Sequence, residues 1–458
     1  MLNITVNDIV KAVNGTLLCG DGTQIIEHIS IDSRSSQGND IFVPIIGEKV
    51  DAHRFISQAL EIGCAATLTS ENEQMTGQKA WIRVEDTIDA LHEIGRLCRS
   101  RIQIPAVGVT GSVGKTTTRE MIATALSAQK KVFKTSKNYN SSVGLPITLS
   151  EMTNEDDIAV LELGMNVPGE LGTISDLASL DMAVLTNIGV AHIEYFGSQD
   201  EICKEKYTIT KGFHGKGLLF INGDDPLLVK YKDLTGYPYI LYGTGEDCEY
   251  RAENIRTVAG KYQFDFVHKD QTVCVTLSVL GHHNVLNATA ALAVADQVGV
   301  DVKAAAKALE SFTGFQNRLQ RYEIHGYTVI DDTYNASPAS MKAGLEVLAN
   351  YPASGRKIAV LGDMFELGEN APQYHYEVGA FAAKLPLDQM LLVGTNAAFI
   401  GKAMKEANAA CEVLVMEQKE DAAAYLGDHV QKGDVVYIKA SNGMKLKEIT
   451  TYLQSKGK

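Results

Sequence analysis

The chain of 458 residues is too long for a single hydrophobic core, so we expect two or three domains. Its formal net charge of −14 argues against binding to a nucleic-acid backbone, although a small anionic ligand needs only a local basic patch. With 45% apolar and 21% charged residues, the composition is typical of a globular protein and excludes a disordered chain.

The cysteines and the apolar runs indicate in which cellular compartment the protein is expected. Seven cysteines, an odd number with no Cys-x-x-Cys pair, are typical of free thiols in a reducing environment. The N-terminus lacks the basic and apolar segments of a secretory signal. No uninterrupted apolar run approaches the roughly 18 residues that a membrane helix needs. We therefore expect a cytoplasmic protein without a membrane partner.

Residues 1–84 predict a small mixed α/β domain. Helical spacing at 6–13 and 55–60 alternates with apolar runs at 40–45 and 64–68 that are typical of strands. The polar triplet Asp32-Ser33-Arg34 falls where the pattern turns. From the residues alone, an Asx-type turn with a solvated arginine is the better interpretation of this triplet.

Residues 85–318 predict a second domain built on a parallel sheet with crossover helices. A helix over 87–101, capped by Asp86, leads into it, and strands and helices then alternate. Residues 215–280 indicate a strand-rich excursion, and a helix follows at 284–298. Asn284 and Asn287 are candidate caps of that helix.

A glycine-rich turn follows the apolar strand at 106–109 and precedes a helix, which is the design of a phosphate-binding loop. Backbone N–H groups in such a turn surround phosphate oxygens, and the helix N-terminus adds partial positive charge. Lys115 would reach the outer phosphates, and the Thr116 hydroxyl would bind magnesium. Val109 stands where the full motif has a glycine, so a turn that binds nothing is the alternative. The turn consists of Thr110, Gly111, Ser112, Val113, Gly114, Lys115, Thr116 and Thr117.

Polar residues end two more of the predicted strands. The run at 158–161 ends in Glu162, and the run at 182–185 is followed by Asn187 and His192. In open parallel sheets, ligands bind at the carboxyl ends of the strands. We therefore expect Glu162 to hold magnesium beside the phosphate loop, with His192 as a further candidate. A surface glutamate, a surface histidine and, for Lys206, a solvated helix face are the alternatives.

Residues 319–458 predict a second doubly wound α/β unit. Strands are expected at 328–330, 358–361, 390–393, 413–415 and 435–438, and 315–321 is expected to be a connector. Ser337-Pro338 is a good helix start. Asp331 and Asp332 follow a strand and should lie at its carboxyl edge. No Gly-x-Gly-x-x-Gly motif supports dinucleotide binding.

These side chains suit phosphoryl transfer by positioning and charge neutralisation. They contain no nucleophile–histidine–acid set, so acyl-enzyme chemistry has no support.

Taken together, the motifs resemble those of the Mur ligases, the ATP-dependent amide-forming enzymes of bacterial cell-wall precursor synthesis. The resemblance runs almost end to end. It rests on Asp32-Ser33-Arg34, the phosphate loop, and residues 161–166, 186–192, 281–287 and 317–319. Residues 138–146, 331–341 and 360–368 resemble the branch of the family that adds a D-alanyl-D-alanine dipeptide.

The resemblance implies a three-domain α/β fold in which each domain binds a different substrate. Residues 1–84 would bind a UDP-sugar, 85–318 would bind ATP as a P-loop domain, and 319–458 would bind the incoming dipeptide. The implied reaction joins D-alanyl-D-alanine to UDP-N-acetylmuramoyl-tripeptide through an acyl phosphate, with ATP and Mg²⁺ as cofactors. A monomer without a nucleic-acid partner is expected.

The family's site residues fall on matching positions of this chain. Lys115, Glu162, His192 and Lys206 would be catalytic. Thr116 and Glu162 would hold magnesium, His192 would lie in the shell of a second metal ion, and a carbamylated Lys206 would bridge magnesium. Lys204 is the alternative to Lys206, and Asn442 stands where an arginine is usual. ATP would be bound by residues 110–117, Asn284, Arg318 and Asp332, and the other substrates by Asp32, Ser33, Arg34, Asn140, Tyr334, Asn335 and Pro338.

Two other functions compete with this interpretation. A sibling ligase with a different amino component, including a folylpolyglutamate-type enzyme, would share the loop and both α/β domains. A nucleotide-switched binding module would hydrolyse ATP slowly and expose a large partner surface.

Overall fold

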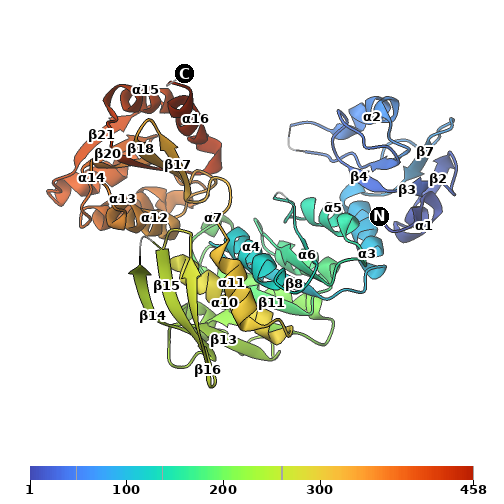
Figure 1. The fold of residues 1–458 in the computed structure, drawn as a ribbon. Coiled ribbons are helices and arrows are strands. Elements are labelled where there is room, and N and C mark those ends of the chain that lie inside the picture. The colour runs from blue at the N-terminus through green and yellow to red at the C-terminus, as the bar shows by residue number, and fades with distance from the viewer. Residues whose placement is uncertain (48, 137, 259–260, 457–458) are drawn as a thin grey trace.

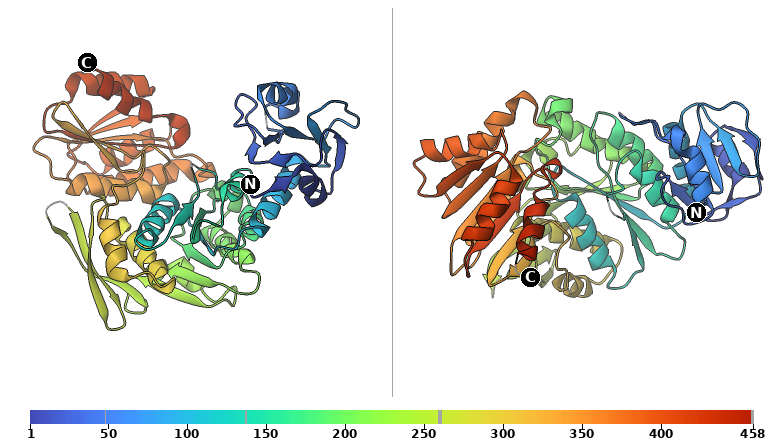
Figure 2. Two further views of the ribbon diagram at one scale, coloured as in Figure 1. Left: turned by 45° about the vertical axis from the view of Figure 1, so that its right-hand side comes forward. Right: turned by 90° about the horizontal axis from the view of Figure 1, so that it is seen from above.

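The computed structural model describes residues 1–47, 49–136, 138–258 and 261–456. The chain forms three regions, with the N-terminal and C-terminal regions set on either side of a central one (Figures 1 and 2). The last two residues of the predicted third domain, 457–458, lie outside the described residues. Within the described chain, no helix has both the length and the apolar character needed to cross a membrane.

The N-terminal region is the predicted small α/β unit. Its five-stranded sheet has the order β2-β7-β6-β5-β4, in which only the β2–β7 pair is antiparallel. The strands are β2 (Thr16–Cys19), β4 (His28–Ser30), β5 (Asp40–Phe42), β6 (Ala66–Thr69) and β7 (Ala80–Arg83), with a small pair β1 (Ile4–Thr5) and β3 (Ile25–Ile26) beside them. The helices are α1 (Val6–Ala12), η1 (Ala52–Phe55) and α2 (Ile56–Ile62). Strand β5 is shorter than predicted, and Pro44, which has no N–H for a ladder, follows two residues after its end.

Helix α3 (Thr87–Ser100) lies between the first two regions (Figure 1). Asp86 caps it as predicted, since its carboxylate accepts hydrogen bonds from the N–H groups of Ile88 and Asp89. Leu91 and Ile94 are buried in the core of the N-terminal region, whereas other parts of α3 contact α5 (Gly144–Glu151) and α6 (Glu170–Ala178). A domain boundary at residue 84 stays a prediction.

The central region is a nine-stranded sheet with the order β16-β15-β14-β13-β12-β11-β8-β10-β9. The pairs from β9 to β14 are parallel, as predicted, and β14, β15 and β16 extend the same sheet in antiparallel fashion. The segment 215–280 is therefore part of this sheet rather than an excursion from it. The strands are β8 (Ala106–Thr110), β9 (Val132–Lys134), β10 (Ile158–Glu162), β11 (Met182–Leu185), β12 (Leu218–Asn222), β13 (Tyr239–Gly243), β14 (Tyr250–Val258), β15 (Lys261–His268) and β16 (Gln271–Leu277).

Helices cover both faces of the parallel part of the central sheet, so its strands β8 and β10 are buried along their whole length, whereas β14, β15 and β16 alternate between buried and exposed residues. One core contains α4 (Lys115–Leu126), α10 (His283–Gln297) and α11 (Val302–Glu310). The other contains α5, α6, α8 (Gln199–Tyr207) and the 3-10 helix η2 (Thr208–Phe213), while α7 (Ile193–Phe196) and α9 (Pro226–Lys230) are short connecting helices.

The C-terminal region is the second doubly wound unit that the sequence predicts. Its six-stranded sheet has the order β17-β18-β22-β19-β20-β21 and is parallel except for the β17–β18 hairpin. The strands are β17 (Gln320–Ile324), β18 (Tyr327–Asp331), β19 (Lys357–Gly362), β20 (Gln389–Val393), β21 (Glu412–Met416) and β22 (Val435–Lys439). The helices are α12 (Pro338–Asn350), η3 (Gly368–Asn370), α13 (Ala371–Ala382), α14 (Ala398–Glu406), α15 (Lys419–His429), η4 (Asn442–Met444) and α16 (Lys447–Ser455).

Two predictions for this region have different outcomes. Ser337 caps α12 as predicted, and its hydroxyl and that of Ser340 form a reciprocal capping box. The connector predicted at 315–321 is wrong at its end, because β17 begins at Gln320. β17 is a half-exposed edge strand rich in polar residues, so its apolar pattern is too weak to indicate a strand.

Candidate active site

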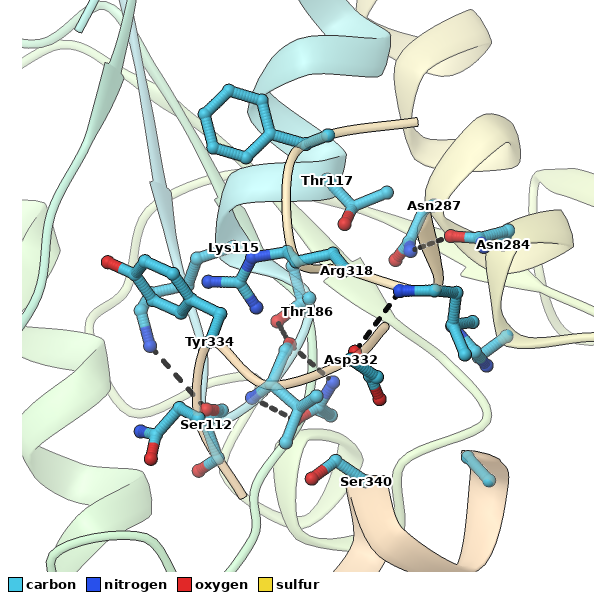
Figure 3. Close-up of a pocket in the computed structure, with 18 of the residues that line it drawn as sticks. Ser112, Lys115, Thr117, Thr186, Asn284, Asn287, Arg318, Asp332, Tyr334 and Ser340 are labelled. Carbon is cyan, nitrogen blue, oxygen red and sulfur yellow. Dashed lines mark hydrogen bonds between the residues drawn. The ribbon is translucent and has the colours of Figure 1, made fainter. Parts of the chain in front are cut away.

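A cavity of about 1060 Å³ lies between the central and C-terminal regions. Its walls come from the phosphate loop, the carboxyl ends of β10 and β11, the start of α10, the segment 312–321 and the start of α12. Figure 3 shows side chains from both regions turned toward this space, among them Lys115 from the loop and Arg318, Asp332 and Tyr334 from the other side. Among the described residues, no side chain of the first 84 lines it.

The phosphate loop is held by the end of the neighbouring strand β11. Asn187 accepts a hydrogen bond from the Val113 N–H at 2.9 Å and donates one to the Val113 carbonyl at 2.8 Å. The Thr186 hydroxyl donates to the same carbonyl at 2.7 Å. Gly111 has a positive φ of 154°, and an added Cβ there would lie 1.8 Å from the Thr186 hydroxyl, so only glycine fits.

Lys115 is the first residue of α4 and lies over its own loop. Its Nζ donates to the Gly111 carbonyl at 2.7 Å. Burial lowers the pKa of Lys115, an effect that nearby Glu162 opposes. The lysine is therefore available to an anion that enters the loop, where the new partner would replace a backbone carbonyl.

Glu162 ends β10 and is only 4% exposed, so the alternative of a surface glutamate is wrong. Arg119 donates to one carboxylate oxygen at 3.1 Å, and Asn140 donates to the other at 2.7 Å. Arg119 also pairs with Glu120 at 2.5 Å, and Glu120 pairs with Lys134 at 2.5 Å. A chain of alternating charges, buried from Glu162 to Glu120 and ending at the exposed Lys134, thus fixes Glu162 at the cavity wall.

Arg318 connects the C-terminal side of the cavity to the phosphate loop. It donates to the Thr116 hydroxyl at 3.1 Å, and its guanidinium lies 4.2 Å from the centre of the Tyr334 ring (Figure 3). Thr116 is 4% exposed. The predicted nucleotide residue Arg318 and the predicted metal ligand Thr116 are therefore in contact.

The start of α10 carries a chain of side-chain hydrogen bonds. The Thr118 hydroxyl donates to Asn287, Asn287 donates to Asn284, and Asn284 donates to the Leu280 carbonyl. Asn284 and Asn287 lie inside the helix, whose N-cap residue His282 makes no side-chain capping bond. Their prediction as helix caps is wrong, because His282 is the N-cap residue, Asn287 instead accepts a hydrogen bond from Thr118 of α4, and Asn284 bonds to Asn287 and to the Leu280 carbonyl.

The adjacent carboxylates Asp331 and Asp332 differ in their surroundings. Asp331 is fully buried and accepts hydrogen bonds from the Thr333 backbone and hydroxyl, as in a turn. Asp332 lines the cavity and accepts from Lys439 at 2.5 Å and from the Tyr437 hydroxyl at 2.9 Å. Burial lowers the pKa of Lys439, while its pairing with Asp332 acts in the opposite direction.

His192 and Lys206 lie at different depths. His192 lines the cavity, and its Nδ1 is 2.5 Å from a carboxylate oxygen of Glu366 in the C-terminal region. Lys206 is only 2% exposed, so its interpretation as part of a solvated helix face is wrong. Its Nζ lies 3.7 Å from the Met165 sulfur, and burial, together with the charge of Lys115, holds the pKa of Lys206 well below its ordinary value.

The predicted substrate residues are divided between two places. Asn140, Tyr334 and Asn335 line the cavity, and Pro338 is buried as the first residue of α12. Asp32-Ser33-Arg34 forms an Asx-type turn in the N-terminal region, where the Arg34 backbone N–H and guanidinium both donate to Asp32. The Arg34 side chain is 81% exposed, so this turn matches the interpretation reached from the residues alone.

The sequence alone gives no reason to single out Arg119, Lys439 or Glu366. Arg119 lies one helical turn after Lys115, on the inward face of α4, and a charge on that face is the signal that could have revealed it. Lys439 is the last residue of β22 and Glu366 follows β19, so both lie at carboxyl strand ends.

Comparison with known proteins identifies the family to which this arrangement belongs. Family models described as "Mur ligase family, catalytic domain", "Mur ligase middle domain" and "Mur ligase, glutamate ligase domain" match residues 25–99, 109–295 and 317–442. A curated Bacillus subtilis protein, UDP-N-acetylmuramoyl-tripeptide–D-alanyl-D-alanine ligase, is 36% identical over 98% of both chains. This chain belongs to the Mur ligase family.

Other relatives of this Mur ligase cover almost its whole length. The Escherichia coli protein with the same name is 30% identical over 100% of both chains. A crystal structure of MurF from Acinetobacter baumannii has a TM-score of 0.89 at 30% identity, covering 98% of each chain. MurF ligase from Thermotoga maritima, solved in complex with ADP, has a TM-score of 0.83 at 29% identity, covering 94% of this Mur ligase and 97% of that chain. The predicted three-domain α/β fold is thus confirmed.

Proposed function

We propose that this Mur ligase uses ATP to join D-alanyl-D-alanine to UDP-N-acetylmuramoyl-tripeptide. The observation that carries the proposal is that one cavity contains the phosphate loop, Glu162, His192, Arg318 and Asp332. The names of its full-length relatives support this choice of substrates over those of a sibling ligase. The reaction belongs to peptidoglycan precursor synthesis, which places the enzyme in the cytoplasm, and we propose that it acts as a monomer.

We assign the nucleotide to the phosphate-loop side of the cavity. Residues 110–117 would surround the phosphates with N–H groups, and Lys115 would transfer its hydrogen bond from the Gly111 carbonyl to a phosphate oxygen. Asn284 would contact the nucleotide from α10. Arg318 and Asp332 would contact it from the side of the C-terminal region.

The donor set fits a hard divalent cation such as Mg²⁺. Thr116, which is buried, and Glu162 offer oxygen ligands beside the loop, and His192, which like Glu162 lines the cavity, offers an imidazole nitrogen to a second cation. Glu162 is held in place by Arg119 and Asn140, so it needs little reorganisation to bind a cation. When bound, Mg²⁺ would neutralise phosphate charge as the phosphoryl group is transferred.

Lys206 has the properties needed for carbamylation. A lysine amine must be neutral to react with CO₂, and burial favours the neutral amine. The charge of Lys115 nearby has the same effect and would stabilise the carbamate once it has formed. We therefore assign Lys206, rather than the exposed Lys204, which pairs with Glu201, as the residue that bridges metal.

The two other substrates would approach from the flanking regions. We assign the UDP-sugar to residues 1–84 with Asp32, Ser33 and Arg34, and ATP to 85–318. We assign the dipeptide to 319–458 with Tyr334, Asn335 and Pro338. Asn140 lines the cavity and donates a hydrogen bond to Glu162, and we assign it to substrate binding there.

In the proposed mechanism, the terminal carboxylate of the peptide attacks the γ-phosphate of ATP, which gives an acyl phosphate and ADP. The dipeptide amine then attacks the acyl carbon, and the resulting tetrahedral adduct loses phosphate to leave the amide. Lys115 and the loop N–H groups would stabilise the charge that builds up in each step. Closing the cavity against water would protect the acyl phosphate from hydrolysis.

The decisive experiment is a coupled assay of ADP release with purified UDP-N-acetylmuramoyl-tripeptide. We expect release that depends on D-alanyl-D-alanine and is absent with single amino acids. Release with a single amino acid, or with a folate and glutamate, would favour a sibling activity. Slow ATP hydrolysis that is unaffected by any peptide substrate would favour a nucleotide-switched binding module.

A further inference from the structure

The segment that carries His192 packs against the C-terminal region. Val190 packs against the apolar core of that region, and Glu366 contacts His192 two residues further on. A Cβ added at Gly368 would lie 3.7 Å from the Glu194 backbone, which shows how closely the two loops approach. The cavity wall at His192 is therefore built by two regions together.

Glu366 is presented by a loop that is fixed within its own region. The Met364 N–H donates to the buried His375 at 2.9 Å, and the Phe365 N–H donates to the Ser441 hydroxyl at 2.9 Å. These two anchors immediately precede Glu366, which adopts a left-handed backbone with φ of 61°. The Glu366 carboxylate would therefore move together with the C-terminal region if that region moved.

We propose that Glu366 is a positioning residue that acts through His192, so that the C-terminal region completes the metal site of the central region. The inference rests on the proposed function, because it takes His192 as a metal ligand. Glu366 itself would touch neither the metal nor a substrate.

The physical reason lies in the two nitrogens of the imidazole ring. A carboxylate 2.5 Å from Nδ1 favours the tautomer that carries its proton on Nδ1. The lone pair is then on Nε2, the nitrogen that remains to bind a cation in the cavity. Histidines that bind metals commonly have a carboxylate partner of this kind, and its loss weakens metal binding or activity by about 10- to 100-fold.

The two atoms are close, but their geometry is not that of an aligned hydrogen bond. The carboxylate therefore acts on the ring mainly through its charge, and Glu366→Gln, which keeps the size of the side chain, is the informative substitution. Glu369→Gln is a matched control, because Glu369 is an exposed carboxylate in the same loop.

The test measures binding of Mn²⁺ to the full-length protein with ADP, by electron paramagnetic resonance. We expect Glu366→Gln to weaken Mn²⁺ binding by about tenfold and to diminish the nitrogen coupling from the histidine ligand. Glu369→Gln should leave both unchanged. In a His192→Ala background, Glu366→Gln should have no further effect, because its action passes through the ring.

Two results would overturn the proposal. One is unchanged Mn²⁺ affinity and nitrogen coupling in Glu366→Gln, and the other is an equal loss of affinity with and without His192. Neither measurement uses the peptide substrates, so the result is independent of which amino component the enzyme takes. Absence of ADP release with D-alanyl-D-alanine, alongside the expected Mn²⁺ results, would reject the proposed substrates and leave the role of Glu366 standing.

Discussion

The cavity beside the phosphate loop and the Asp32–Arg34 turn are both candidate binding sites, yet they are built in opposite ways. In the cavity, Arg318 contacts Thr116 across 202 positions of sequence, and Glu162 is held by Arg119 across 43. In the turn, Asp32 and Arg34 bind each other across two positions and face solvent. The cavity is defined by the tertiary fold, whereas the turn is defined by local backbone geometry.

This difference predicts how much stability the protein loses when a residue of each site loses its partner. The cavity residues are buried and charged, so each must keep its partner or leave a desolvated charge. The exposed turn can lose a partner at little cost, because water replaces it. Substitutions in the cavity should therefore affect stability and ATP chemistry strongly, and substitutions in the turn should affect only the binding of a ligand that the turn contacts.

The largest effect is expected for Arg119→Met. This change leaves Glu162 and Glu120 buried with one positive partner fewer, and loss of one partner from a buried pair costs about 3–5 kcal/mol. Chemical denaturation would measure the loss in the free energy of unfolding. Arg96→Met, which removes a half-exposed pair between Arg96 on α3 and Asp176 on α6, should cost only about 0–1 kcal/mol. Equal losses in the two variants would contradict the distinction between buried and exposed pairs.

Next in size is Lys115→Ala. Removing a donor that stabilises charge in the transition state costs about 10²- to 10³-fold in kcat, so ADP formation should fall to near background. Circular dichroism should show an unchanged fold, because within the part of the chain that the structure describes, Lys115 donates hydrogen bonds only to carbonyls of its own loop. Near-normal turnover would remove the phosphate loop from the proposed mechanism.

A smaller effect is expected from the pH dependence of stability at His283, which also lines the cavity. Burial lowers the pKa of His283 to about 4, whereas an unfolded histidine titrates at about 6.5. Between these values the unfolded chain binds a proton that the folded chain does not, so the free energy of unfolding decreases as pH falls from about 6.5 to about 4. His283→Gln should flatten this part of the pH profile, as measured by urea denaturation. An identical slope in the variant would show that His283 is not held neutral.

The smallest effect on stability is expected for Asp32→Asn. Hydrogen bonds from Arg34 lower the pKa of Asp32 to about 2, so the contribution of this pair is complete above about pH 4 and is lost only as pH falls through about 2. Stability and the KM for ATP should be unchanged at neutral pH. The KM for UDP-N-acetylmuramoyl-tripeptide should rise if the turn contacts the UDP-sugar. A change in the KM for ATP alone would contradict the proposed separation of the two sites.

The sequence predicts those parts of the fold and site that follow from local patterns. The phosphate loop, the strand that ends in Glu162 and the cap at Ser337 are each visible in a few neighbouring residues. β17 escapes prediction because only two of its five residues, Tyr322 and Ile324, are apolar, which is too short an alternation to indicate a strand. Asn284 and Asn287 are misread as caps, because the partner of Asn287 on α4, Thr118, is distant in sequence and Asn284 bonds to Asn287 in turn.

The candidate site shows the same limit. Sequence position indicates that Glu162, His192 and Lys115 lie at strand ends, but it cannot say what holds them. Arg119, Lys439 and Glu366 act as partners of other side chains, and a partner is defined by distance in space. Such residues are accessible to sequence reasoning only after the fold is known.

Arg318 lies in the short strap between α11 and β17, and its guanidinium contacts Thr116. If the nucleotide binds as proposed, a rotation of the C-terminal region about this segment would move the Arg318 guanidinium toward the phosphates or away from them. We therefore expect the release of ADP and the rotation of the C-terminal region to occur at the same rate, because each movement requires the other.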